Sequence, residues 1–180
     1  KKLQFIGGHL VLEDNIDMPS INGFNFLQHI GQNLTIQFNY SLLSVQGFRR
    51  LNTVQGKILF HGSKIRTIPS FDKLITLGDG IEIDDTNLIN INSFNNIIEI
   101  GGGLGKSRRN LHIHRNEILT TISGFQKLNR LDGGFDVTNN RNLISLEGFS
   151  NLSNTGTLDI SSNESITNLS GLEGLSKVGY

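Results

Sequence analysis

A short apolar pattern returns along the chain at nearly constant spacing. In seven places two apolar residues flank a single residue, and the first members of these pairs lie 24, 24, 23, 30, 24 and 23 residues apart. The pairs are Leu10/Leu12, Leu34/Ile36, Ile58/Phe60, Ile81/Ile83, Leu111/Ile113, Phe135/Val137 and Leu158/Ile160. Seven apolar pairs at nearly constant spacing indicate structural repeats that stack on one another. We therefore predict one solenoid domain over residues 1–180, with units that start near residues 10, 34, 58, 81, 111, 135 and 158.

Other positions keep step with these pairs. A small polar residue stands five positions after each first member: Asn15, Asn39, Ser63, Thr86, Asn116, Asn140 and Asn163. Further on, after a Gly or Ser, comes a large apolar residue: Phe24, Phe48, Phe71, Phe94, Phe125, Phe149 or Leu172. We expect the polar residues to form an inward-facing ladder that satisfies backbone groups at a corner, and the phenylalanines to stack as a spine.

The spacing within a unit indicates its local structure. An apolar pair with polar residues between and after it is typical of a short strand with one buried face. Downstream, apolar residues recur every third position, as from Leu42 to Val54 in the second unit. An α-helix advances about 100° per residue, so this spacing would drift around its surface. The spacing instead favours 3₁₀-like turns or short extended segments bent at corners.

The full pattern, I-x-G-x-L-x-I-x-x-N-x-x-x-L-x-x-L-x-G-F-x-x-L-x-x-I, resembles the receptor L-domain family and, more loosely, leucine-rich repeats. "LTIQFN" at 34–39 matches the leucine-rich consensus, whereas "IGQNL" and "IGGGL" look more like the L-domain. The resemblance covers the whole chain. It implies a mainly β fold, a right-handed parallel β-helix or leucine-rich-repeat-like horseshoe of about seven 23–24-residue units. It also implies an extracellular or cell-surface location and a role in binding.

Composition narrows the classes of function. Net charge is zero, with 16 basic and 16 acidic residues, so the basic surface of a nucleic-acid-binding protein is missing. No apolar run approaches the roughly 20 residues that cross a bilayer, so we expect no membrane insertion by this segment. The absence of Cys excludes disulfides and thiolate zinc sites. It also favours a bacterial or otherwise Cys-poor surface protein over animal receptors, whose L-domains carry Cys-rich caps.

The two ends of the chain fall inside units. "KKLQFIGG" begins in mid-unit, with Leu3 and Ile6 in the positions of Leu27 and Ile30, and "SKVGY" stops where another unit would open. Because solenoids need polar caps on their exposed ends, we expect a segment of a longer protein, with caps and any signal or anchor outside it. The oligomeric state cannot be inferred from the sequence.

"IGGGLGKS" at 100–107 resembles the sequence of a phosphate-binding loop. That motif requires Gly five residues before the Gly of Gly-Lys-Ser, and residue 100 is Ile. The spacing before the fifth register is instead longer by about seven residues, which predicts a surface loop. Lys106, Arg108 and Arg109 in this loop could meet an anionic partner, although a merely solvated loop is an equally open alternative.

The strand residues that point outward are the main candidates for a site. In the middle of the sheet they are His61, Glu82, Asp84, His112, His114 and Asp136. Imidazole and carboxylate groups on successive rungs make His61, Asp84 and His114 weak candidates for a metal site. An open sheet face does not exclude water, however, and we expect no cofactor, no metal and no catalytic residue.

The sequence thus predicts a non-catalytic recognition or scaffold module. Its partner would be a glycan or a protein, bound through the solvent face of the parallel sheet. Two alternatives stay open. One is a carbohydrate-active β-helix enzyme, which would need two carboxylates facing each other across a cleft, about 5–9.5 Å apart. The other is a structural spacer without a ligand.

Overall fold

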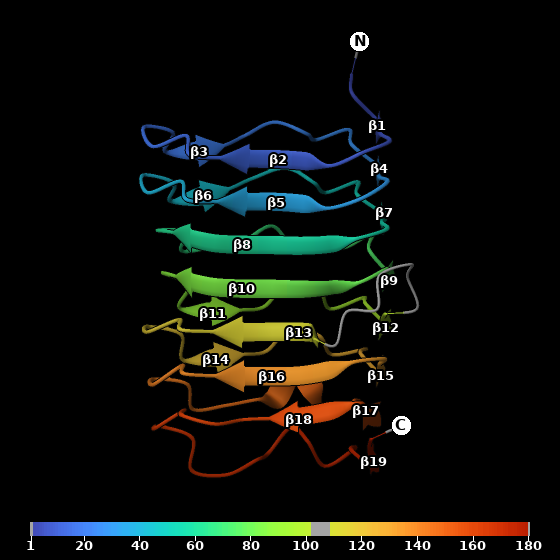
Figure 1. Ribbon diagram of the computed structural model, residues 1–180, viewed down its shortest axis with the longest axis vertical. Coiled ribbons are helices and arrows are strands. Elements are labelled where there is room, and N and C mark those ends of the chain that lie inside the picture. Colours follow the sequence, from blue (N-terminus) through green and yellow to red (C-terminus); the bar gives the residue numbers. More distant parts are fainter. Residues whose placement is uncertain (1, 102–108, 180) are drawn as a thin grey trace.

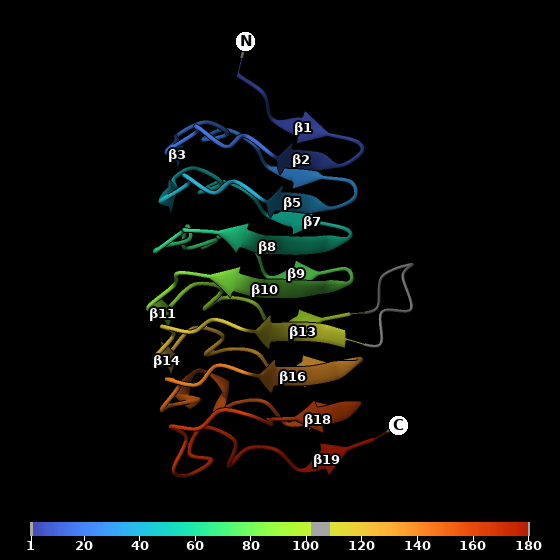
Figure 2. The same ribbon diagram turned by 60° about the vertical axis from the view of Figure 1, so that its left-hand side comes forward.

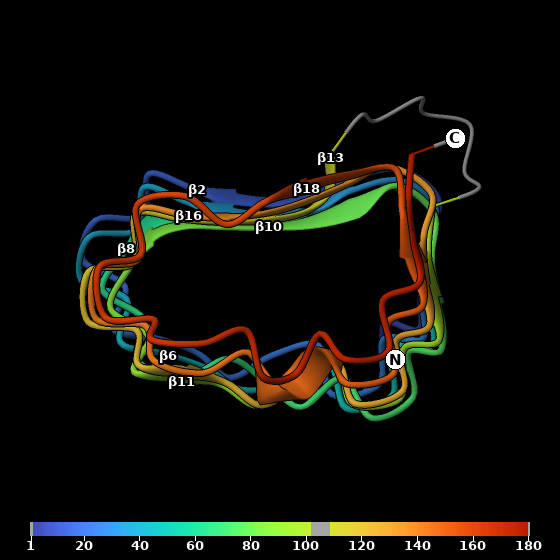
Figure 3. The ribbon, with the colours of Figure 1, turned by 90° about the horizontal axis from the view of Figure 1, so that it is seen from below.

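Parallel strands stack rung on rung into a β-solenoid of about seven turns in the computed structural model (Figure 1). The structure describes residues 2–101 and 109–179. Seen along its axis, each coil is a flattened loop with the long strands on one broad side (Figure 3). In Figure 1 these strands run from right to left in front while the chain descends and returns behind, so the coil is right-handed.

The broad side is a seven-stranded parallel sheet, in the order β18-β16-β13-β10-β8-β5-β2. Its strands are β2 (Leu10–Glu13), β5 (Leu34–Gln37), β8 (Lys57–Ser63), β10 (Gly80–Thr86), β13 (Arg109–His114), β16 (Gly134–Thr138) and β18 (Thr157–Asp159). Register pairs such as Leu34↔Ile58 and Ile81↔Leu111 join first members of the apolar pairs. The predicted strands and their register are confirmed.

A second parallel sheet of eight very short strands forms a narrow side of the coil (Figure 2). These are β1 (Phe5–Ile6), β4 (His29–Ile30), β7 (Thr53–Val54), β9 (Thr76–Leu77), β12 (Glu99–Ile100), β15 (Arg130–Leu131), β17 (Asn154–Thr155) and β19 (Lys177–Val178). Ile6 pairs with Ile30, as the repeat predicts for the start of the chain. The sequence did not predict this sheet, because a two-residue strand is too short to show an alternation.

The remaining side contains short extended pieces and turns. β3 (Ser20–Ile21) pairs with β6 (Ser44–Val45), and β11 (Asn90–Ile91) pairs with β14 (Thr121–Ile122). One 3₁₀ helix, η1 (Glu147–Phe149), is the only helix within 2–101 and 109–179. The three-residue spacing thus corresponds mainly to short extended segments bent at corners, with a 3₁₀ turn at η1.

The polar ladder closes the corner after the long strands. The side-chain oxygen of Asn116 accepts a hydrogen bond from the backbone N–H of Thr86 at 3.1 Å. Its amide group donates to the carbonyls of Ile83 and His114, at 3.0 and 2.9 Å. One rung on, Asn140 accepts from the N–H of Asn116 at 3.0 Å. Buried backbone groups need such partners, so the fully buried asparagines are structural, as predicted.

The corner itself is a sharp backbone turn. The residue before each ladder position has a positive φ, between 50° and 58°: Asp14, Phe38, Gly62, Asp85, Arg115, Asn139 and Ser162. L-residues visit this left-handed region rarely, and Asn, Asp and Gly most readily. Where asparagine occupies the ladder, as at Asn116 and Asn140, its hydrogen bonds hold the chain in this turn.

The aromatic spine fills the opposite side of the core. Neighbouring rings from Phe24 through to Phe149 stack with centroids 4.9 to 6.1 Å apart. A Cβ added at Gly124 would lie 2.0 Å from the carbonyl oxygen of Ser93 on the previous rung. The same close approach occurs at Gly47 and Gly148, so glycine is required before these spine positions.

Candidate functional site

The outward face of the seven-stranded sheet carries a continuous polar network. Strands β8, β10, β13 and β16 place His61, Asp84, His114 and Thr138 side by side, since the register pairs Asp84 with His61 and with His114, and His114 with Thr138. The structure thus brings the predicted histidines and Asp84 together on consecutive rungs. We call this set, with Glu82, His112, Arg115 and Asp136, the outer patch.

Asp84 is the centre of the outer patch. Its oxygen Oδ2 lies 3.0 Å from Nδ1 of His61. The guanidinium of Arg115 donates to both carboxylate oxygens, from Nε at 3.1 Å and from a terminal nitrogen at 2.6 Å. Asp84 is only 6% exposed although it lies on an open sheet. A bidentate arginine is the partner that best compensates a carboxylate withdrawn from water.

A second group of contacts lies one strand further on. The hydroxyl of Thr138 donates to Asp136 Oδ1 at 3.0 Å and lies 2.7 Å from Nδ1 of His114. Nδ1 of His112 is 3.2 Å from Asp136 Oδ2, but the two atoms are not aligned as a hydrogen bond. The rings of His112 and His114 stack with centroids 5.2 Å apart. These contacts fix the directions of both imidazoles.

The electrostatics of the outer patch act on His114. Burial is the main cause that lowers the pKa of His114 below 6.5, and the neighbouring His112 and Arg115 lower it further. Asp84 and Asp136 oppose this effect. Because the partner Asp84 supplies a hydrogen-bonded negative charge, the pKa of the Arg115 guanidinium is raised.

The remaining predicted residues divide into two cases. Glu82, within the outer patch, lies 3.6 Å from the ammonium of Lys57. Lys106 and Arg108 lie outside the described residues, and the side chain of Arg109 does too, although its backbone begins β13. Their interaction with an anionic partner stays a prediction.

Within the described ranges, no three His, Cys, Asp or Glu side chains are grouped so that they could hold a metal ion. His61 and Asp84 contact each other, but His114 turns to Thr138. The same part of the chain contains no helix long and apolar enough to span a membrane.

Comparison of the chain with known protein families, curated proteins and solved structures finds no match.

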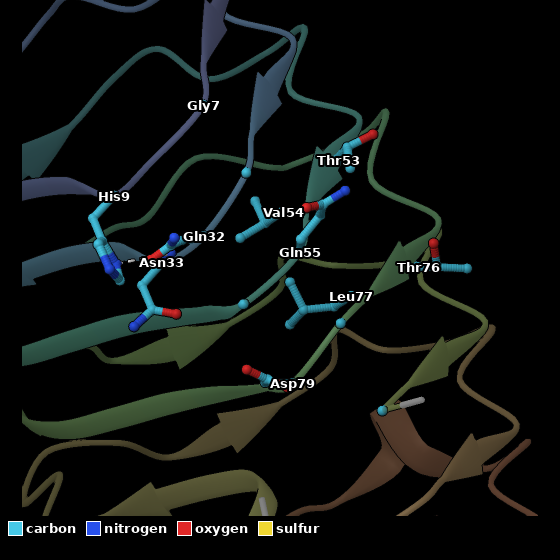
Figure 4. A pocket seen from close by; sticks show the side chains of 14 residues that line it. Gly7, His9, Gln32, Asn33, Thr53, Val54, Gln55, Thr76, Leu77 and Asp79 are labelled. Atoms are coloured by element: carbon cyan, nitrogen blue, oxygen red, sulfur yellow. Dashed lines mark hydrogen bonds between the residues drawn. The ribbon is translucent and has the colours of Figure 1, made fainter. Parts of the chain in front are cut away.

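A groove that sequence reasoning missed runs along the corner between the two large sheets (Figure 4). Its volume is about 900 Å³, and it spans successive rungs from Gly7 to Gly101. Glycines occupy this corner because the rungs approach closely there: a Cβ at Gly78 would lie 1.8 Å from the carbonyl oxygen of Gln55. The glycine before each long strand is the signal that could have located the groove.

Proposed function

We propose that the protein is a non-catalytic recognition module that binds a glycan or a protein through the outer patch. The observation that carries this proposal is the outer patch itself. Its side chains are held by one another across four rungs, with Asp84 bound at once by His61 and Arg115. Side chains fixed before binding lose little conformational entropy when a ligand arrives.

The same contacts favour recognition over acid–base catalysis. Both oxygens of Asp84 already accept hydrogen bonds from a guanidinium that stays charged. The guanidinium thus engages both oxygens that a catalytic base would have to direct at a substrate. The resemblance of the repeat to receptor L-domains and leucine-rich repeats agrees with a binding role, and with an extracellular or cell-surface location.

A glycan array tests the proposal, with the wild-type chain beside the variant His61→Gln/Glu82→Gln/His114→Gln. Glutamine retains polarity and much of the size of the replaced side chains, and the Asp84–Arg115 pair stays intact. The matched control is Asn90→Ala/Thr121→Ala, two paired outward residues on β11 and β14.

Binding that the outer-patch variant loses and the control keeps would support a glycan site on the outer patch. Binding that both variants keep would contradict the use of this surface. If the wild type binds no glycan, a protein partner or a spacer without a ligand is favoured.

A further inference from the structure

We infer that the corner groove is a second binding site, for an uncharged oligosaccharide that lies along the solenoid axis. The groove is separate from the outer patch, because none of the outer-patch residues lines it. The inference therefore does not depend on the proposed function.

The side chains that line the groove are mostly neutral hydrogen-bonding groups. Gln32 and Asn33 come from one rung, Thr53 and Gln55 from the next, and Thr76 from the one after (Figure 4). Among the described lining residues Asp79 is the one carboxylate, and none is Lys or Arg. This composition suits a ligand rich in hydroxyl groups and without net charge.

Several of these groups have hydrogen-bonding capacity to offer. Within the described part of the chain, the side chains of Gln32, Gln55 and Thr76 make no hydrogen bond to protein. Asn33 uses its oxygen to accept from the N–H of Lys57 at 2.9 Å, and its NH₂ group has no such partner. Amide and hydroxyl groups can both donate and accept, so they can match sugar hydroxyls in either direction.

The backbone of the groove excludes another ligand class. The N–H groups of Gly31, Gly56 and Gly78 donate to carbonyls of the preceding rung, at 2.8, 3.2 and 3.2 Å. A peptide that adds as a strand needs an edge with free N–H and C=O groups, and the side of a solenoid has none. Recognition must then come from side chains.

The large apolar side chains of the groove lie buried beneath it. Its apolar lining residues, Val54 and Leu77, are each only 1% exposed, so they present almost no hydrophobic surface. Next to Gly7, at the N-terminal end of the groove but outside its lining, the Phe5 ring stacks on His29 with centroids 4.6 Å apart. A sugar ring could pack its apolar face on such an aromatic surface.

The repeat distance supports an extended ligand. Rungs of a parallel sheet are about 4.8 Å apart, close to the length of one sugar unit, and Thr53 and Thr76 occupy equivalent positions on adjacent rungs. A chain of sugars that lies along the axis can therefore contact side chains of several rungs, and its affinity should rise with chain length until the groove is filled.

The test is a panel of soluble neutral and acidic oligosaccharides, two to six sugars long, titrated into the wild-type chain and into Gln55→Ala/Thr76→Ala. Both residues are exposed and make no side-chain hydrogen bond to described residues, so the variant should fold. The outer-patch variant and the Asn90→Ala/Thr121→Ala control complete the set. Amide NMR shifts report where the ligand lies.

We expect a neutral oligosaccharide to bind, with shifts at Gln55, Thr76 and Gly78. Affinity should fall at least tenfold in the groove variant and stay unchanged in the other two. The inference is overturned if no oligosaccharide binds, if only acidic ones bind, or if the groove variant binds as well as wild type. Loss of binding in the outer-patch variant alone would overturn the groove and support the proposed function, so the two failures are distinguishable.

Discussion

The inner corner and the outer face of the seven-stranded sheet are both columns of polar side chains, yet they are built from different chemistry. Inside, Asn116 and Asn140 are fully buried and neutral. Outside, the column contains Asp84, His114 and the guanidinium of Arg115. A neutral amide can be buried without penalty when each donor and acceptor is matched, whereas a charge needs a paired charge and access to water. The inner column therefore stabilises the fold, and the outer column is the surface that we propose for recognition.

The inner column also varies along its length. Where Ser63 and Thr86 replace Asn, β8 and β10 are seven residues long and pair through the corner, with Ser63 opposite Thr86. Where Asn39 occupies the corner, β5 has only four residues. The serine hydroxyl reaches only the carbonyl of His61 on its own rung, at 3.1 Å. Backbone pairing thus replaces the side-chain link that asparagine provides elsewhere.

The largest effect is expected from Asn116→Ala. The substitution removes the buried hydrogen bonds that Asn116 makes to the N–H of Thr86 and to the carbonyls of Ile83 and His114. An unsatisfied buried group costs about 1–3 kcal/mol, so the free energy of unfolding should fall by about 3 kcal/mol, measured by urea denaturation. Asn90→Ala, at an exposed site, should change it by less than about 0.5 kcal/mol. Equal losses in the two variants would contradict the structural role of the ladder.

Asp84→Asn should have a smaller effect on stability. It removes the charge that pairs with Arg115 but keeps the shape of the side chain. Because the Arg115 side chain is 56% exposed, solvent weakens this pair, and we expect a loss of about 1 kcal/mol in the free energy of unfolding. A loss as large as that of Asn116→Ala would mean that the outer patch stabilises the fold as strongly as the buried ladder does.

Ser63→Ala is the matched substitution within the inner column. It removes a single hydrogen bond to the carbonyl of His61, while the backbone pairing between Ser63 and Thr86 remains. The free energy of unfolding should fall by only about 0.5–1 kcal/mol. If the loss matched that of Asn116→Ala, the backbone would not be compensating for the missing asparagine.

The smallest effect concerns pH. Burial lowers the pKa of His114 in the folded chain below 6.5, so the unfolded chain binds more protons at mildly acidic pH. Stability contributed by this residue is present above about pH 6.5 and is lost as the pH falls below it. His114→Gln should therefore make the unfolding free energy less sensitive to pH between about 7.5 and 5.5. Urea denaturation at both values checks this, and a steeper dependence in the variant would reverse the sign.

Most of the fold could be predicted because equivalent side chains of successive units stack on one another, so similar residue types recur at fixed offsets in the sequence. The pair Ile81/Ile83, the corner Asn116 and the spine residue Phe125 each recur at fixed offsets, and the structure places each as expected. The two-residue strands such as Thr76–Leu77 could not be predicted in this way. Only their stacking with neighbouring rungs makes them strands.

The outer patch was predicted in part. Alternation along a strand correctly placed His61, Asp84 and His114 on one face. It could not include Arg115, which comes next in sequence and would point inward in a regular strand. The positive φ of Arg115, 50°, turns the chain at the corner, and its side chain returns to Asp84. The prediction missed Arg115 because side chains alternate between the two faces only within a regular strand, and the backbone turns at this residue.

Amide hydrogen exchange at Asn116 and Asn140 tests the division between inner and outer columns most directly. Their N–H groups donate to the next asparagine at 3.0 and 2.9 Å. In the wild-type chain both amides should exchange as slowly as those in the centre of β13, and His61→Gln/Glu82→Gln/His114→Gln should leave their rates unchanged. Rapid exchange in the wild type would contradict the claim that the buried asparagines hold the corner. Faster exchange in the outer-patch variant would contradict the claim that they do so independently of the outer patch.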